Sequence, residues 1–149
     1  MRATCSALIR TVYAARFGAH RRRQGKDMLA ETDVLRRTAT LQAAYFLMTG
    51  LWPIVSRPTF EAVTGPKTDY WLVRTVGALA SVIGATLGVA SYRNRVSSEL
   101  AVLGIGSALA FGAVDVFYAT TGRISRVYLV DAAVECVIAG GWASALQRP

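Results

Sequence analysis

The chain has 149 residues, which is enough for one ordinary domain. Hydrophobic residues make up 53% of it and the mean hydropathy is +0.36, which is high for a soluble domain. The net charge of +8 comes without a stripe of basic and aromatic residues on a soluble scaffold, so we expect no nucleic-acid partner. Cys5, Cys136 and the single histidine, His20, have no metal-ligand spacing, so no metal or cofactor is expected.

Residues 1–34 are predicted to form a basic N-terminal tail, followed by a membrane domain over 35–149. The tail, "MRATCSALIRTVYAARFGAHRRRQGK" onward, has no acidic residue before Asp27 and no continuous apolar segment of the signal-peptide kind. Three interpretations stay open: a disordered extension, an amphipathic helix on anionic lipid, and an organellar type of presequence. A start at Met28 is a further alternative, in which 1–27 would not belong to the native protein.

Four segments approach the roughly 20 apolar residues that a helix needs to cross a bilayer. They cover 38–55, 70–92, 99–120 and 127–146, and turn or charged residues separate them. The alternative is a soluble four-helix bundle, but each helix of such a bundle should carry a charged face. The last three segments have none. The sequence therefore predicts an all-α, integral membrane four-helix transmembrane bundle.

Small residues recur at four-residue spacing on two of these segments. Such faces let helix backbones approach closely in lipid. The partner of each face is either a helix of the same chain or a helix of a second copy or larger membrane complex. The residues concerned are Ala80, Gly84 and Gly88 on one segment, and Gly104, Ala108 and Gly112 on the next.

Four spans place both chain termini on the same side of the membrane. Most of the 17 Lys and Arg residues lie on that side, including the pairs Arg36–Arg37 and Arg93–Arg95 beside the spans. The positive-inside rule makes that side cytoplasmic. We therefore expect a multi-pass protein of the inner (plasma) membrane with cytoplasmic termini.

Four ionisable residues fall inside the predicted spans: Arg74, Asp115, Asp131 and Glu135. Counting helical rise from the span ends places all four in one layer, roughly 6–12 Å below the non-cytoplasmic surface. Arg74 is predicted to be the counter-ion of the carboxyls, because unpaired buried charges are destabilising. At least one carboxyl is expected to be protonated at neutral pH. In the alternative interpretation, Arg74 and Asp131 extend into water and only anchor helix ends.

The segment "RPTFEAVTGPKTD" is predicted to be a loop on the same side of the membrane. It carries Glu61, Lys67 and Asp69, which are candidates for a lid over the charged layer. The simpler interpretation is a helix cap with solvated charges, in which Thr68 or Asp69 caps the following helix.

The stretch "GLWPIVSRPTFEAVTGPKTDYWLVRTVGALASVIG" resembles the first half of small four-helix membrane proteins of the bacterial DoxX-like group. The resemblance rests on a helix that ends near Pro58 and Phe60, a Gly-containing loop, and a helix with Arg74 shortly before Gly77. It extends in layout over residues 35–147. It implies a bacterial inner-membrane four-helix bundle and transfers no catalytic residue. Some members are linked to redox or thiol stress, and this chain lacks a conspicuous thiol pair.

The leading functional expectation is a non-enzymatic accessory or scaffold subunit of the membrane that contains a buried charge cluster. The first alternative is a small proton-linked transporter that uses Asp115, Asp131 and Glu135 as its titrating site. The second is a membrane enzyme acting on a lipid-like substrate, in which Asp131 and Glu135 carry out acid–base chemistry.

Overall fold

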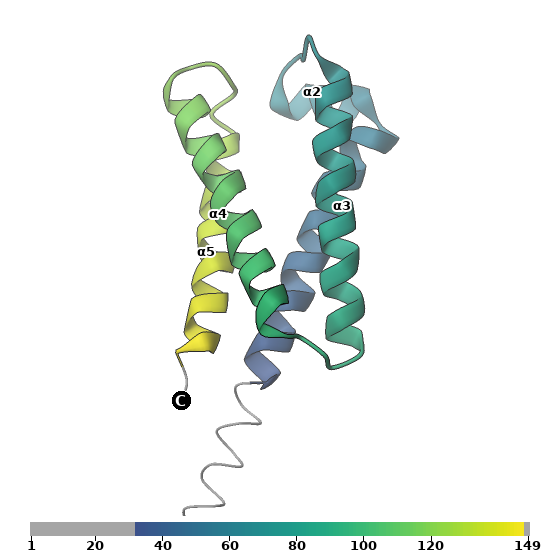
Figure 1. Cartoon of the computed structure of the whole chain (residues 1–149). Helices are drawn as coiled ribbons and strands as arrows, with labels where there is room; N and C mark the ends of the chain where they lie inside the picture. The colour runs from purple at the N-terminus through teal and green to yellow at the C-terminus, as the bar shows by residue number, and fades with distance from the viewer. Residues whose placement is uncertain (1–31, 148–149) are drawn as a thin grey trace, which may run out of the picture.

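The computed structural model describes residues 32–147, so the predicted tail up to residue 31 lies outside the described part of the chain. The described residues form helices and no strand. A first helix, which we call the N-terminal helix, covers residues 32–55. It is followed by the elements labelled in Figure 1: α2 (Arg57–Thr64), α3 (Tyr70–Tyr92), α4 (Ser98–Thr120) and α5 (Tyr128–Leu146).

Three of these helices, α3, α4 and α5, are long and apolar enough to cross a membrane, with mean hydropathies of 1.7, 2.0 and 1.5. Their outer surfaces carry large exposed apolar side chains, such as Val82 (64% exposed), Val102 (69%) and Val137 (75%). Water would disfavour so much exposed apolar surface, whereas lipid would not. The prediction of apolar, membrane-type helices is confirmed for these three. Their bounds agree with the predicted spans to within one residue.

The first predicted span, 38–55, is helical but is not among the three helices that are apolar enough to cross a membrane. The polar Gln42 interrupts its apolar character and is buried. The helix runs without a break from residue 32 to residue 55, across the predicted domain boundary at residue 34. Its buried polar residues, Thr38 and Gln42, therefore lie on the side that packs against other helices.

The N-terminal helix contacts all three long helices. Figure 1 shows it beside α3, with α4 and α5 lying together as a second pair. Its Phe46 ring packs edge-on against Phe111 of α4, with the ring centroids 5.4 Å apart. Its Gly50 approaches Gly77 of α3 so closely that a Cβ atom on Gly77 would collide with the Gly50 carbonyl oxygen. The N-terminal helix is thus the element around which the other helices are arranged.

The predicted small-residue faces pack within the chain. Gly84 of α3 lies against Ala43 and Phe46 of the N-terminal helix, and Gly104 of α4 lies against Trp142 of α5 and Gln42. Because the same chain occupies these faces, a second copy would have to use other surfaces. The buried members of the two faces are Ala80, Gly84, Gly104, Ala108 and Gly112, and Gly88 is partly buried.

The segment between the N-terminal helix and α3 is not the open loop that the sequence predicted, because it contains the two-turn helix α2. Ser56 has an extended backbone, so the chain turns there before α2 starts. The Trp52 and Phe60 rings pack edge to face at 5.6 Å and fold α2 back onto the N-terminal helix. Gly65 ends α2 with φ +84°, a conformation that glycine adopts without steric cost. The predicted loop is therefore wrong for residues 57–64, which are helical.

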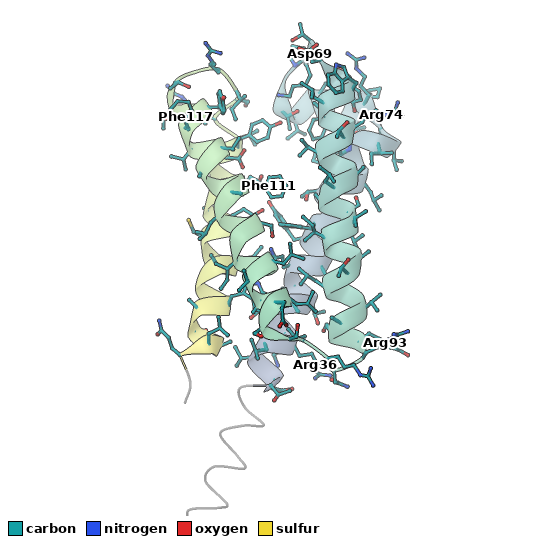
Figure 2. All side chains as sticks on the ribbon, in the orientation of Figure 1. Arg36, Asp69, Arg74, Arg93, Phe111 and Phe117 are labelled. Atoms are coloured by element: carbon teal, nitrogen blue, oxygen red, sulfur yellow. The ribbon has the colours of Figure 1, made fainter. Side chains whose placement is uncertain are left out.

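Charged residues lie at both ends of the bundle. Arg36 and Arg93 lie at the end where the N-terminal helix begins, and Asp69 lies at the opposite end (Figure 2). The last residues of α5 lie at the same end as Arg36 (Figure 1). The long helices therefore run alternately up and down between two ends, and the carboxyl-rich end is the one that α2 covers.

Candidate acidic site

Three carboxyl groups from α4 and α5 converge near the end of the bundle that α2 covers. The side chains of Asp115 and Glu135 are buried, with exposed fractions of 7% and 2%, and Asp131 is half-buried. The carboxyls of Asp115, Asp131 and Glu135 are close enough to one another for direct electrostatic interaction. The sequence predicted that these acids share a layer, and the structure does bring them together.

Local backbone spacing brings the carboxyls together. Gly112 lies one turn before Asp115 on α4, and a Cβ atom there would sit 3.4 Å from the Cβ of Glu135. Gly112 therefore lies on the face of α4 that packs against Glu135 of α5, at a spacing that would still admit a Cβ atom. On α5, Asp131 and Glu135 are four residues apart, so they share one face of the helix.

A tyrosine from a third helix completes this group. The Tyr45 hydroxyl of the N-terminal helix donates a hydrogen bond to the Asp131 carboxylate oxygen Oδ1. Asp115, Asp131, Glu135 and Tyr45 are called the acidic site from here on. Because the four residues come from three helices, the site depends on the correct packing of all three.

Two oxygens of the acidic site have no hydrogen-bond partner among residues 32–147. They are Oδ2 of Asp115 and Oε2 of Glu135, and both atoms are buried. Leaving a buried polar atom unpaired costs about 1–3 kcal/mol, and more when the group is charged. Native proteins rarely retain such atoms without a functional or ligand-related reason. These two oxygens therefore mark the position at which a proton or a hydrogen-bond donor would be accepted.

Arg74, the predicted counter-ion, does not reach the carboxyls. It is exposed and lies on the side of α3 that faces away from α4 in Figure 2. Within residues 32–147 the ion pairs are Arg36–Asp33, Arg37–Asp33 and Arg57–Glu61, and none involves the acidic site. Arg74 misses the carboxyls because it lies on a different face of α3 from the residues that pack inside the bundle. The face of α3 that packs on the N-terminal helix passes through Gly77 and Val73, and Arg74 is rotated about 100° from Val73.

Two of the three predicted lid residues take part in one hydrogen-bonded segment. Glu61, in α2, accepts bonds from Arg57 Nε and from the Lys67 backbone N–H, each at 3.0 Å. The Arg57 guanidinium, helped by the Lys67 amide, lowers the pKa of Glu61 below its usual range. The third residue, Asp69, is exposed at the N-cap position of α3 and makes no side-chain capping bond.

Lys67 connects this segment to α5. Its ammonium donates to the Thr64 carbonyl at 2.9 Å and lies 5.0 Å from the centroid of the Tyr128 ring. Partial burial lowers the pKa of Lys67, while the charge of Glu61 acts in the opposite direction. The segment after α2 is thus held against the first turn of α5, above the acidic site.

Tyr128 lies between that segment and the acidic site. Its side chain is within hydrogen-bonding reach of Thr64 and is close enough to Asp115 and Asp131 to sense their charge. Asp131 follows it by three residues, on the same side of α5. Tyr128 is therefore the aromatic group that links the α2 segment to the carboxyls.

Sequence reasoning missed Tyr45, Tyr128 and Gln42. The three-residue spacing between Tyr128 and Asp131 places the two on one helix face. Gln42 and Tyr45 are also three residues apart on one face, within an otherwise apolar segment. That pair of polar side chains is the signal that would have identified the N-terminal helix as the third wall of the site.

Within residues 32–147, no group of three or more His, Cys, Asp and Glu side chains has an arrangement suited to a metal ion. Comparison of the chain with protein-family models, curated proteins and solved structures finds no match to any of them.

Proposed function

We propose that this protein is a four-helix inner-membrane protein, and that its acidic site binds and releases protons as part of a small proton-linked carrier. In this proposal the N-terminal helix is the first membrane span and both termini are cytoplasmic. The single observation that carries the functional part is the pair of buried carboxyl oxygens, on Asp115 and Glu135, that face no donor.

The chemistry of the neighbouring groups favours a proton. Three carboxyls that interact electrostatically in a buried cluster favour a proton on one of them, because ionised carboxylates offer only acceptors to one another. No ion pair within residues 32–147 brings a cation to the site. Three negative charges without a base would be strongly destabilised in a low-dielectric interior. A bound proton relieves that repulsion, and its loss makes the site ready to accept another cation.

The basic residues of the sequence support the orientation. Arg36 and Arg93 lie at the end opposite the acidic site (Figure 2), and most of the 17 Lys and Arg residues belong to that end once the basic N-terminal tail is counted. The acidic-site end carries Arg57, Lys67, Arg74, Arg123 and Arg126. A cytoplasmic excess of Lys and Arg is the usual orientation signal. The acidic site would then lie near the non-cytoplasmic surface, beneath α2.

A second candidate function is the accessory or scaffold role, and the packing below the site favours it. Gln42, Phe46 and Trp142 are each at most 1% exposed and fill the bundle between the acidic site and the cytoplasmic end. A carrier would have to rearrange these side chains during each cycle, whereas a scaffold would leave them in place.

Proton-coupled flux decides between the two functions. The full chain is reconstituted in vesicles that contain a pH-sensitive dye, and a pH gradient is imposed. A carrier should dissipate the gradient when a substrate mixture is added, and Asp115→Asn and Glu135→Gln should abolish that effect. Glu99→Gln is the matched control, because Glu99 is an exposed carboxylate at the opposite end of α4. If wild-type and variant vesicles behave alike while both variants remain folded, the carrier proposal is wrong.

A further inference from the structure

The protein already binds one alkylammonium group, that of Lys67, beside the acidic site. Lys67 Nζ lies over the Tyr128 ring and donates to a backbone carbonyl, and it forms no ion pair with a carboxylate within residues 32–147. An aromatic face together with carbonyl oxygens is how proteins recognise organic ammonium ions. The outer side of the site is therefore suited to a cationic amine.

The same ring adjoins a strong negative field. Tyr128 is close enough to Asp115 and Asp131 to sense their charge, and the unpaired oxygens of Asp115 and Glu135 lie in the same cluster. Within residues 32–147 neither of these oxygens accepts a hydrogen bond from an N–H or O–H group. A primary ammonium group supplies three N–H donors. The requirements of the site thus match both the charge and the donors of an amine.

Apolar rings adjoin the carboxyls on the other side. Phe111 lies one turn before Asp115 on α4 and projects between α4 and the neighbouring helices (Figure 2). Its ring packs edge-on against Phe46. An amine that carries an aromatic or aliphatic body would find both a polar and an apolar contact here.

We infer that the acidic site binds a primary organic amine in exchange for a proton, and that Lys67 is a tethered competitor at the Tyr128 ring. This inference rests on the proposed proton-binding function and names its substrate class. The exchange is balanced in charge, since one ammonium enters for each proton released. The titratable and charged groups that face the site are Tyr45 from the N-terminal helix, Asp115 from α4, Tyr128, Asp131 and Glu135 from α5, and Lys67 from the segment after α2.

The test uses the full chain in nanodiscs of zwitterionic lipid, with benzylamine as the probe and benzyl alcohol as its uncharged counterpart. Isothermal titration in weakly buffered solution should show saturable benzylamine binding with release of a proton, and no saturable binding of benzyl alcohol. Glu135→Gln and Asp115→Asn should weaken benzylamine binding at least about tenfold, as expected when a buried charged partner is removed. Glu99→Gln should leave it unchanged.

Lys67→Ala keeps the inference testable if the carboxyl variants fail to fold, since Lys67 lies outside the long helices. Removal of the competitor should strengthen benzylamine binding several-fold. Unchanged or weaker binding by Lys67→Ala would contradict the role of Lys67, and equal uptake of benzylamine and benzyl alcohol would overturn the inference as a whole.

Infrared spectroscopy separates this inference from the proposed function. A protonated carboxyl gives a carbonyl band at neutral pH. Loss of that band in Glu135→Gln or Asp115→Asn supports proton binding. If that band is present but benzylamine does not bind, the amine inference fails and proton binding stands. If the band is absent and benzylamine does not bind, both fail.

Discussion

The indole N–H of Trp142 donates a 2.7 Å hydrogen bond to the side-chain oxygen of Gln42, which is 100 residues away in the chain. The Gln42 amide nitrogen in turn donates to the Gly104 carbonyl at 2.9 Å. Both Gln42 and Trp142 have an exposed fraction of 0%. One amide thus connects the N-terminal helix to α4 and α5, and it fixes their relative depth in an otherwise apolar core.

Replacement of Gln42 by leucine should destabilise the bundle by about 1–2 kcal/mol, because hydrogen bonds between membrane helices contribute amounts of this order. The Trp142 N–H would lose its partner inside the core. Reversible unfolding of the full chain in mixed micelles measures the change. Gln147→Leu, at an exposed position at the end of α5, is the control and should have little effect. Equal stabilities of the two variants would contradict a structural role for the Gln42 bonds.

Gly77→Ala should separate the N-terminal helix from α3. The added methyl group would collide with the Gly50 carbonyl, and overpacking of this kind typically costs about 1–3 kcal/mol. Gly140→Ala is the matched control, because a Cβ atom at Gly140 meets nothing within 4 Å. The same unfolding assay should show a loss for Gly77→Ala only. A neutral result at Gly77 would mean that the two helices do not pack as described.

Tyr45→Phe removes the hydroxyl that donates to Asp131 and leaves that carboxyl with one partner fewer. Hydrogen bonds to charged groups contribute about 1.5–3 kcal/mol, so the variant should lose stability of that order near neutral pH. Tyr92→Phe tests the same chemical change at a residue that is 88% exposed, and it should be neutral. If the two variants unfold alike, the Tyr45–Asp131 bond contributes nothing measurable.

The bond from the Lys67 backbone N–H to Glu61 should report the protonation of Glu61. The pKa of Glu61 is lowered in the folded chain, mainly by Arg57, so its stabilising effect is present above the usual glutamate range. That effect is lost as the pH falls through the lowered value. The amide chemical shift of Lys67, followed by NMR in micelles, should therefore change with a midpoint below the ordinary glutamate pKa.

Arg57→Gln should move this midpoint upward, towards the ordinary value. Arg74→Gln is the control, since Arg74 is exposed on the same end of the bundle and forms no ion pair within residues 32–147. A midpoint that is insensitive to Arg57→Gln would remove Arg57 as the cause.

Cys136 should react only with membrane-permeant thiol reagents in a Cys5→Ser background. It is exposed on the outer surface of α5, next to Val137, which is 75% exposed. Lipid around that surface would exclude charged reagents. Thr121→Cys, in the exposed turn after α4, serves as the water-accessible comparison in a chain that also lacks Cys136. Rapid labelling of Cys136 by a charged maleimide would contradict a lipid-facing α5.

Much of the helical layout was predictable because apolar segments of about 20 residues have one dominant physical solution in lipid. The start and end of α3 follow from the change between charged and apolar residues at Asp69–Tyr70 and Tyr92–Arg93. The α2 helix was not predicted, because it depends on the contact between Trp52 and Phe60 and on the Arg57–Glu61 pair rather than on hydropathy. Short helices of this kind gain their stability from tertiary contacts.

The sequence predicted how deep the acidic residues lie along their helices, but it did not predict the direction in which each side chain points. Counting residues along each helix gave the common layer of Asp115, Asp131 and Glu135, yet depth says nothing of the angle at which a side chain leaves its helix. Arg74 has the depth that the sequence predicted, but it points away from α4 because α3 packs through a different face. The contribution of Tyr45 also depended on which helices are neighbours, and one sequence alone does not specify that.

The resemblance to the DoxX-like group stays a prediction, and so does the interpretation as a lipid-modifying enzyme. The contacts of the basic tail with anionic lipid concern residues outside the described range.

The hydrogen bonds of Gln42 also bear on the order in which the chain is made. During synthesis the N-terminal helix emerges first, but the partners of its buried amide are Gly104 and Trp142, in α4 and α5. Gly104 follows Gln42 by 62 residues and Trp142 follows it by 100, so this amide lacks its last partner until α5 has been made. Insertion of the N-terminal helix must therefore precede assembly of the bundle, which is complete only after α5 has been synthesised.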